Sequence, residues 1–122
     1  MSKQVLLIDD DKTWLELAGL SLQNAGYDVL CAGDGSEALQ KADTATLGLI
    51  VLDLNLGGES GLTLMNYLKR NHPEAVILLV TGMEHDDSTI RAMLELGADQ
   101  YLRKGSMEQL LVTVGSYFKQ LS

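Results

Sequence analysis

The sequence contains only one cysteine and one proline among its 122 residues. Cys31 has no partner within the chain, which excludes an internal disulfide and agrees with a reducing compartment. Pro73 marks the end of a predicted helix, because the residue before a proline disfavours helical backbone angles. The fold must therefore be stabilised without a covalent cross-link.

The sequence also lacks long apolar runs and an excess of basic residues. No stretch approaches the roughly 20 apolar residues of a membrane-spanning helix. Met1–Gln4 shows no apolar core of a secretory signal. Nine Lys and Arg stand against 17 Asp and Glu, whereas nucleic-acid backbones attract basic patches. We therefore predict a cytoplasmic domain that binds neither membranes nor nucleic acid directly.

The sequence does contain five apolar runs, each followed by a helical pattern. The predicted strands are Val5–Ile8, Tyr27–Cys31, Leu49–Leu52, Val76–Val80 and Gln100–Arg103. The predicted helices are Lys12–Ala25, one starting at Asp34, Gly61–Asn71, Ser88–Leu96 and one starting at Ser106. Residues 55–60 are predicted to form a loop. Repeated βα units in a chain of this length predict one α/β domain, a (βα)5 three-layer sandwich with a parallel five-stranded sheet.

Polar residues follow the ends of four predicted strands. Asp9 and Asp10 follow the first strand, Asp53 the third, Thr81 the fourth and Lys104 the fifth. In a parallel sheet these ends lie at one edge, the carboxyl edge, where open α/β sheets bind ligands. Acidic residues after the first and third strands also favour a switch point between them, and therefore the strand order 2-1-3-4-5.

The acidic residues of this edge predict a cation site. Asp9, Asp10 and Asp53 offer only oxygen ligands, which suit Mg²⁺ or Mn²⁺ better than zinc. A backbone carbonyl just past Asp53, such as that of Asn55, is a further candidate ligand. The simpler alternative for the acidic triplet is a solvated turn that caps the next helix, and Asp11 is the expected cap.

The same edge carries groups suited to phosphoryl chemistry. An aspartate such as Asp53 can act as a nucleophile and accept a phosphoryl group, which gives an acyl phosphate. The Lys104 ammonium would neutralise charge on the phosphoryl oxygens, and the Thr81 hydroxyl would donate a hydrogen bond to one of them. Trp14, on the first predicted helix, is expected only to pack or to be partly exposed.

Four short motifs together resemble the receiver domain of bacterial two-component response regulators, including the chemotaxis regulators. They are Ile8–Asp11, Asp53–Leu56, Val80–Gly82 and Gly97–Lys104. The resemblance covers the whole chain and implies the flavodoxin-like fold. It also implies that Asp53 is the phospho-acceptor.

The resemblance further implies that Asp9, Asp10, Asp53 and the Asn55 carbonyl hold Mg²⁺. It likewise implies that Thr81 and Lys104 bind the phosphoryl group. Tyr101 would be the aromatic side chain whose rotamer changes when Thr81 moves inward.

The implied function is a phosphorylation-controlled switch. Its phosphoryl donor would be a phosphohistidine on a sensor histidine kinase or a phosphotransfer protein. Phosphorylation would change the partner-binding surface, and so the contact with an output domain, a downstream protein or a second copy of the chain. Such a domain is not an enzyme beyond its own phosphorylation and autodephosphorylation. Residues 1–122 would form a single receiver domain, either alone or trimmed from a longer regulator.

Two glycines depart from the family pattern. Gly57 stands four residues after Asp53, where the family often has proline, and Gly leaves a loop more backbone freedom. Gly105 follows Lys104, where the family usually has a proline that is frequently in a cis peptide. A non-proline cis bond costs about 3 kcal/mol, so we expect a trans bond before Gly105.

Two alternative functions remain open from the sequence. The first is a Mg²⁺-dependent phosphatase of the haloacid dehalogenase type, which also uses an aspartate nucleophile at a strand end. Such enzymes need a second acid two residues later, where this chain has Asn55. The second is a receiver that acts only as a phosphorylation-independent scaffold, which the complete set of acids, threonine and lysine disfavours.

Overall fold

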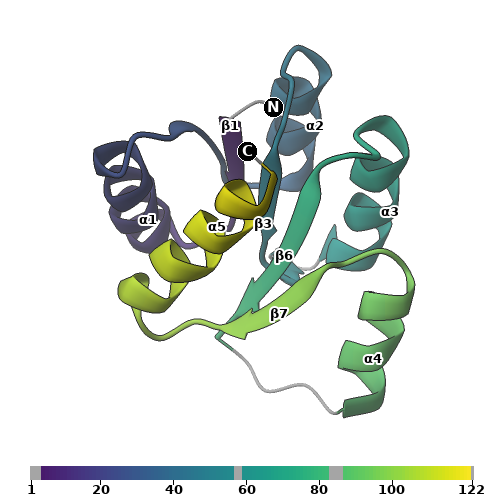
Figure 1. The fold of residues 1–122 in the computed structure, drawn as a ribbon. Helices are drawn as coiled ribbons and strands as arrows, with labels where there is room; N and C mark the ends of the chain where they lie inside the picture. The colour runs from purple at the N-terminus through teal and green to yellow at the C-terminus, as the bar shows by residue number, and fades with distance from the viewer. Residues whose placement is uncertain (1–3, 57–58, 83–86, 122) are drawn as a thin grey trace.

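A parallel five-stranded sheet lies at the centre of the computed structural model, which describes residues 4–56, 59–82 and 87–121 (Figure 1). The strands are β1 (Gln4–Ile8), β2 (Asp28–Ala32), β3 (Leu49–Leu52), β6 (Val76–Thr81) and β7 (Gln100–Arg103). Their order is β2-β1-β3-β6-β7, with every neighbouring pair parallel. In order along the chain this is 2-1-3-4-5, so the predicted flavodoxin-like fold is confirmed.

Five helices form the outer layers of the sandwich. They are α1 (Lys12–Asn24), α2 (Gly35–Asp43), α3 (Gly61–Asn71), α4 (Asp87–Glu95) and α5 (Met107–Leu121). Helices α1 and α5 cover one face of the sheet, and α2 and α3 cover the other (Figure 1). None of these helices, as far as the chain is described, is both long and apolar enough to cross a membrane.

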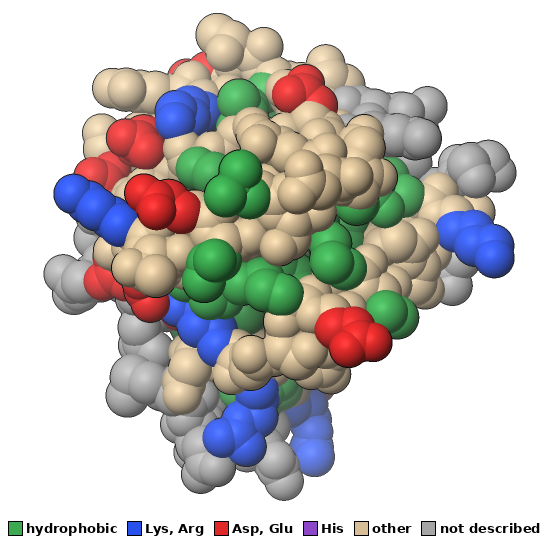
Figure 2. All heavy atoms as spheres, turned by 90° about the vertical axis from the view of Figure 1, so that its left-hand side faces the viewer, with side chains coloured by type: hydrophobic (Ala, Val, Ile, Leu, Met, Phe, Trp, Pro, Cys, Tyr) green, Lys and Arg blue, Asp and Glu red, His purple; other side chains and the backbone are tan. Residues whose placement is uncertain are grey.

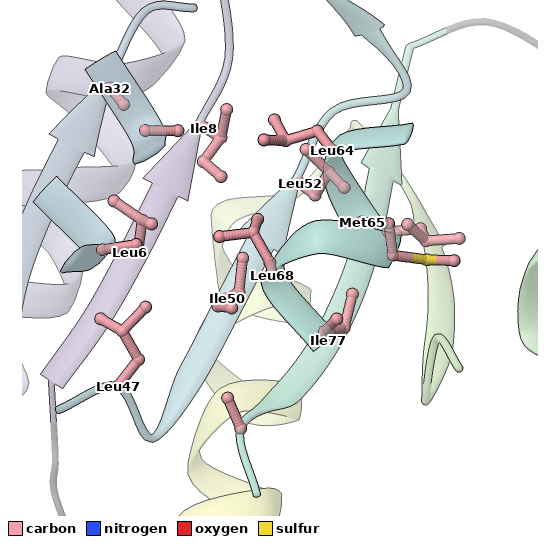
Figure 3. Close-up of a cluster of buried hydrophobic side chains, with 14 of the residues drawn as sticks. Leu6, Ile8, Ala32, Leu47, Ile50, Leu52, Leu64, Met65, Leu68 and Ile77 are labelled. Atoms are coloured by element: carbon pink, nitrogen blue, oxygen red, sulfur yellow. The ribbon is translucent and has the colours of Figure 1, made fainter. Parts of the chain in front are cut away.

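The central strands are buried on both faces, which explains their uninterrupted apolar sequences. Successive side chains of a strand point to opposite faces, so β1 sends Leu6 and Ile8 toward α2 and α3 but Val5 and Leu7 toward α1 and α5. Figure 3 shows the first of these clusters, where Leu68 of α3 lies over the side chains of the sheet. The sheet is therefore fixed between two separate apolar cores.

Hydrophobic side chains also reach the surface of the molecule. Figure 2 shows the side formed by α1 and α5, where green hydrophobic side chains lie among charged ones. Leu17 and Leu20 of α1 and Val112 of α5 are the most exposed large hydrophobic side chains among the described residues. They belong to neither core cluster.

The prediction of a loop over residues 55–60 was wrong. Strands β4 (Asn55–Leu56) and β5 (Glu59–Ser60) form a small antiparallel pair, with Asn55 opposite Ser60 and Leu56 opposite Glu59. The sequence Gly57-Gly58 between these strands is a typical signal of a β-hairpin. Gly57, one of the two departures from the family pattern, lies outside the described residues.

Candidate functional site

The backbone ladder of the sheet places Asp9 and Asp53 side by side at the carboxyl edge. The Asp9 amide donates to the Ala32 carbonyl at 3.0 Å, and the Asp53 amide donates to the Ile8 carbonyl at 2.9 Å. Each aspartate thus extends the pairing one residue beyond its strand. Both residues are buried, with 0% of Asp9 and 5% of Asp53 exposed, which is unusual for carboxylates.

The three consecutive aspartates divide between two tasks. The Asp11 side chain accepts a hydrogen bond from the Trp14 amide at 3.1 Å and caps α1, as expected from the sequence. The Asp11 amide in turn donates to Asp9 Oδ1 at 2.9 Å. Asp10 is exposed. Capping of α1 therefore occupies Asp11 and leaves Asp9 and Asp10 for the site.

The donor atoms at this edge fit a hard divalent cation. Carboxylate oxygens of Asp9, Asp10 and Asp53 all lie within 4.8 Å of one another. Asp9 Oδ2 is fully buried and accepts no well-directed hydrogen bond from the described residues. A buried carboxylate needs a positively charged partner, and a divalent cation that binds oxygen ligands can be one.

Lys104 brings a positive charge to the same carboxylates. Its Nζ lies 2.6 Å from Asp9 Oδ2 and 3.5 Å from Asp53 Oδ2. The contact with Asp9 is an ion pair rather than a well-directed hydrogen bond. Partial burial alone would lower the pKa of Lys104, but the two carboxylates outweigh burial and raise this pKa above its usual value. The lysine is therefore held in its charged form at the site.

Thr81 and Tyr101 lie on the two strands that lead to Lys104. Thr81 is the last residue of β6 and is fully buried, and its carbonyl accepts a hydrogen bond from the Lys104 amide at 2.9 Å. Tyr101 lies opposite Leu79 and packs, half-buried, against the cluster beneath α2 and α3. The fold brings Thr81 and Lys104 to the edge that holds the acids and places Tyr101 three residues before Lys104.

Two residues that the sequence interpretation did not assign to the site also touch this edge. The Trp14 ring centroid lies 5.1 Å from Lys104 Nζ. Gly61 begins α3 so close to the end of β3 that a Cβ there would lie 3.0 Å from the Leu54 backbone and 3.3 Å from the Asp53 carbonyl oxygen. Spacing along one strand or helix gives no signal for either contact, because each joins separate elements.

Fold and site together define a class of domain: a flavodoxin-like sheet with an acidic cluster, a threonine and a lysine at its carboxyl edge. The family model of the response regulator receiver domain matches residues 5–114. The chain belongs to this family. The resemblance predicted from the four sequence motifs is thereby confirmed.

Known relatives agree with this family. The alkaline phosphatase synthesis transcriptional regulatory protein PhoP of Bacillus subtilis (strain 168) is 38% identical over 104 residues, which cover 85% of this chain and 43% of that protein. The chain spans less than half the length of the curated relatives it matches: the matches cover 43% of PhoP and 44% of a second transcriptional regulatory protein.

Solved structures show the same fold. The chemotaxis response regulator CheY4 of Vibrio cholerae has a TM-score of 0.86 at 29% identity, covering 96% of this chain and 99% of that chain. A response regulator from Burkholderia pseudomallei, described with a phosphorylated aspartic acid, a calcium ion and citrate, has a TM-score of 0.84 at 31% identity. That match covers 99% of this chain and 74% of that chain.

Proposed function

We propose that this domain accepts a phosphoryl group on Asp53 from a phosphohistidine. An Asp53 carboxylate oxygen attacks phosphorus, the phosphorus–nitrogen bond breaks, and the imidazole leaves with the bonding electron pair and takes up a proton. The observation that carries this proposal is the buried Asp53 carboxylate, grouped with those of Asp9 and Asp10 and 3.5 Å from the Lys104 ammonium. The phosphorylated aspartic acid described for the Burkholderia pseudomallei relative supports it.

The proposed acceptor reaction depends on Mg²⁺ or Mn²⁺. Asp9, Asp10 and Asp53, with the backbone carbonyl of Asn55, are the groups that would hold the ion, and all of them are oxygen ligands. When bound, the cation would neutralise charge on the phosphoryl oxygens.

Two further side chains act on the same oxygens in this proposal. Lys104 supplies a fixed positive charge, and the Thr81 hydroxyl donates a hydrogen bond to one of the phosphoryl oxygens.

Phosphorylation would switch the domain between two conformations. The new group adds negative charge and acceptor oxygens next to Thr81 and Lys104. Movement of Thr81 toward these oxygens would let Tyr101 repack from its half-buried position, which changes the surface of α4, β7 and α5. Water attack at phosphorus, with cleavage of the bond to the Asp53 oxygen, returns the resting state. Self-phosphorylation and this autodephosphorylation are the only reactions that we assign to the domain.

The proposed partners follow from the family to which the chain belongs. The phosphoryl donor is a sensor histidine kinase or a phosphotransfer protein in the cytoplasm. The receiver of the signal is an output domain, a downstream protein or a second copy of this chain, without direct binding of nucleic acid or membrane by the domain. Residues 1–122 would serve as a single receiver domain, whether alone or as part of a longer regulator like its curated relatives.

The test is chemical phosphorylation with phosphoramidate and Mg²⁺, measured by intact mass and by the acid and base lability of the product. Wild type should gain one phosphoryl group, which is lost in base as expected for an acyl phosphate. Asp53→Asn should gain none. Asp43→Asn is the matched control, because Asp43 is an exposed aspartate at the end of α2, and this variant should behave like wild type.

Other outcomes would favour the alternative functions. Repeated turnover of p-nitrophenyl phosphate that requires Asp53 would indicate a phosphatase. Absence of beryllofluoride binding by wild type in the presence of Mg²⁺, or equal binding by Asp53→Asn, would indicate a scaffold.

A further inference from the structure

The domain has a single tryptophan, and the start of α1 fixes its place. The Trp14 amide donates to Asp11 Oδ1 at 3.1 Å, and the amide of the next residue, Leu15, donates to the Asp11 carbonyl at 3.0 Å. The ring is half-buried and packs against the apolar cluster beneath α1 and α5. Trp14 is therefore held from both its backbone and its side chain.

The indole ring lies against the ammonium of the site. Lys104 Nζ is 5.1 Å from the ring centroid, within the distance of about 6 Å at which a cation is attracted by an aromatic face. The same Nζ contacts the carboxylates of Asp9 and Asp53. One ammonium group thus has two carboxylates and one aromatic ring around it, and Trp is the aromatic residue that attracts cations most strongly.

The residue that follows Lys104 places no restriction on this long side chain. The backbone amide of Lys104 makes the last hydrogen bond of the β6–β7 pairing, to the Thr81 carbonyl. Gly105 follows in a trans peptide, as expected, and a Cβ at Gly105 would meet no atom within 4 Å. A lysine carries its charge on a flexible four-carbon stem. Contacts from other elements must therefore place the ammonium.

We propose that Trp14 is a positioning residue for Lys104. Its ring keeps the ammonium against Asp9 and Asp53 in a chain whose residue after the lysine is a glycine rather than the family's usual proline. The effect on phosphoryl acceptance rests on the proposed function, because Trp14 acts only through Lys104. The alternative is that Trp14 merely fills space over the core. In that case, withdrawing electrons from its ring would not change the rate of phosphorylation.

Ring fluorination separates these two roles. Because Trp14 is the only tryptophan, protein grown on tryptophan with increasing numbers of ring fluorines changes at this one ring and barely in volume. Fluorine withdraws electrons from the ring face and weakens its attraction for a cation. The rate of phosphorylation by phosphoramidate should fall stepwise with fluorine number, by about threefold to tenfold over the series. Equal rates across the series would overturn the proposal.

A second measurement does not depend on phosphorylation. Ring currents of Trp14 should shift the ¹H resonances of the Lys104 side chain away from those of exposed lysines in an NMR spectrum. Trp14→Leu should remove this shift, and Trp14→Phe should retain part of it. Tyr27→Leu is the matched control, because Tyr27 is another aromatic residue packed on the same cluster, and it should leave the Lys104 resonances and the phosphorylation rate unchanged.

The two measurements distinguish failure of this inference from failure of the proposed function. A wild type that is never phosphorylated would refute the acceptor role of Asp53, while the Lys104 resonances would still report on the contact with Trp14. Lys104 resonances that are the same in wild type and in Trp14→Leu would refute the positioning role, whatever the phosphorylation result.

Discussion

The two edges of the sheet differ in how their charged side chains are paired and in the volume of the hollow beside them. At the carboxyl edge, Asp9 and Asp53 are buried around one ammonium, and the cavity beside Lys104 and Trp14 has a volume of about 10 Å³, room for about one water molecule. At the amino edge, an open groove of about 380 Å³ lies between residues 45–47 and 71–75. The larger hollow therefore lies away from the buried charges.

Charged side chains at the amino edge serve the backbone instead. Lys69 Nζ donates to the Ala75 carbonyl at 3.2 Å, and Asp99 Oδ2 accepts a hydrogen bond from the Ile77 amide at 2.8 Å. Each charge completes the hydrogen bonding of a turn or strand end. At the carboxyl edge the charges face one another. Buried charges that pair with one another are typical of functional sites, so the carboxyl edge rather than the larger groove is the candidate site of the proposed phosphoryl chemistry.

The largest expected difference between the edges is the loss of a lysine. Lys104→Met leaves the carboxylates of Asp9 and Asp53 without their ammonium, and we expect the free energy of unfolding to fall by about 3 kcal/mol without divalent ions. Lys69→Met removes one lysine-to-carbonyl hydrogen bond and should cost about 1 kcal/mol. Urea unfolding in EDTA measures both. Equal losses would remove the distinction between the two edges.

Much of this site could be predicted from sequence because parallel strands end together. Asp9, Asp53, Thr81 and Lys104 each follow or end an apolar run, and topology alone then assigns them to one edge. The role of Asp11 within the acidic triplet was also predictable, since an aspartate before a helical pattern is a typical N-cap.

Contacts between separate elements could not be predicted in this way. The sequence assigns Trp14 to the apolar stripe of α1, and only the folded structure shows that its ring lies against Lys104, which follows β7. Gly61 reads as an ordinary helix start, and only the sharp return of the chain from β3 to α3 brings it against Leu54. Such contacts depend on how neighbouring elements pack, which periodicity does not encode.

Close packing at the carboxyl edge leads to the next expected effect. Gly61→Ala places a methyl group 3.0 Å from the Leu54 backbone, so the chain just after Asp53 must move. We expect a loss of about 2 kcal/mol in stability, together with slower phosphorylation. Gly105→Ala is the control, because its methyl group would meet nothing within 4 Å.

Unfolding curves and phosphoramidate kinetics for both glycine variants test this expectation. If Gly61→Ala is as stable as Gly105→Ala and is phosphorylated at the same rate, the turn after β3 accommodates the added methyl group and the expectation is wrong.

Divalent ions should stabilise only through the carboxyl edge. Mg²⁺ at ten times its dissociation constant should add about 1.4 kcal/mol to the free energy of unfolding. Asp10→Asn removes one of the grouped carboxylates and should abolish most of this gain. Glu74→Gln, an exposed acid lining the amino-edge groove, should keep the gain in full. Thermal unfolding with and without Mg²⁺ gives the comparison, and a gain that depends on Glu74 instead would reverse the assignment of the edges.

The smallest expected effect concerns an alkaline transition near the amino edge. Tyr117 donates its hydroxyl hydrogen to Gln100 Oε1 at 2.9 Å, at the start of β7. Burial first and the negative charge of Asp99 second raise the pKa of Tyr117 above its usual 10.0. The unfolded chain then loses this proton at a lower pH than the folded domain, so the free energy of unfolding should decrease as pH rises above about 10.

Tyr117→Phe isolates this contribution, because phenylalanine cannot ionise. Its stability should fall less than that of wild type between pH 8 and pH 11, by a fraction of a kcal/mol, when urea unfolding is compared at each pH. Lys104, whose pKa the carboxylates raise, loses its stabilising charge in both proteins only as pH rises through that higher value, so the difference between them reports on Tyr117. Identical pH dependence in the two proteins would mean that Tyr117 ionises equally easily in the folded and unfolded chain. Alkaline sensitivity would then come from other groups, with the carboxyl-edge pairing of Lys104 as the first to examine.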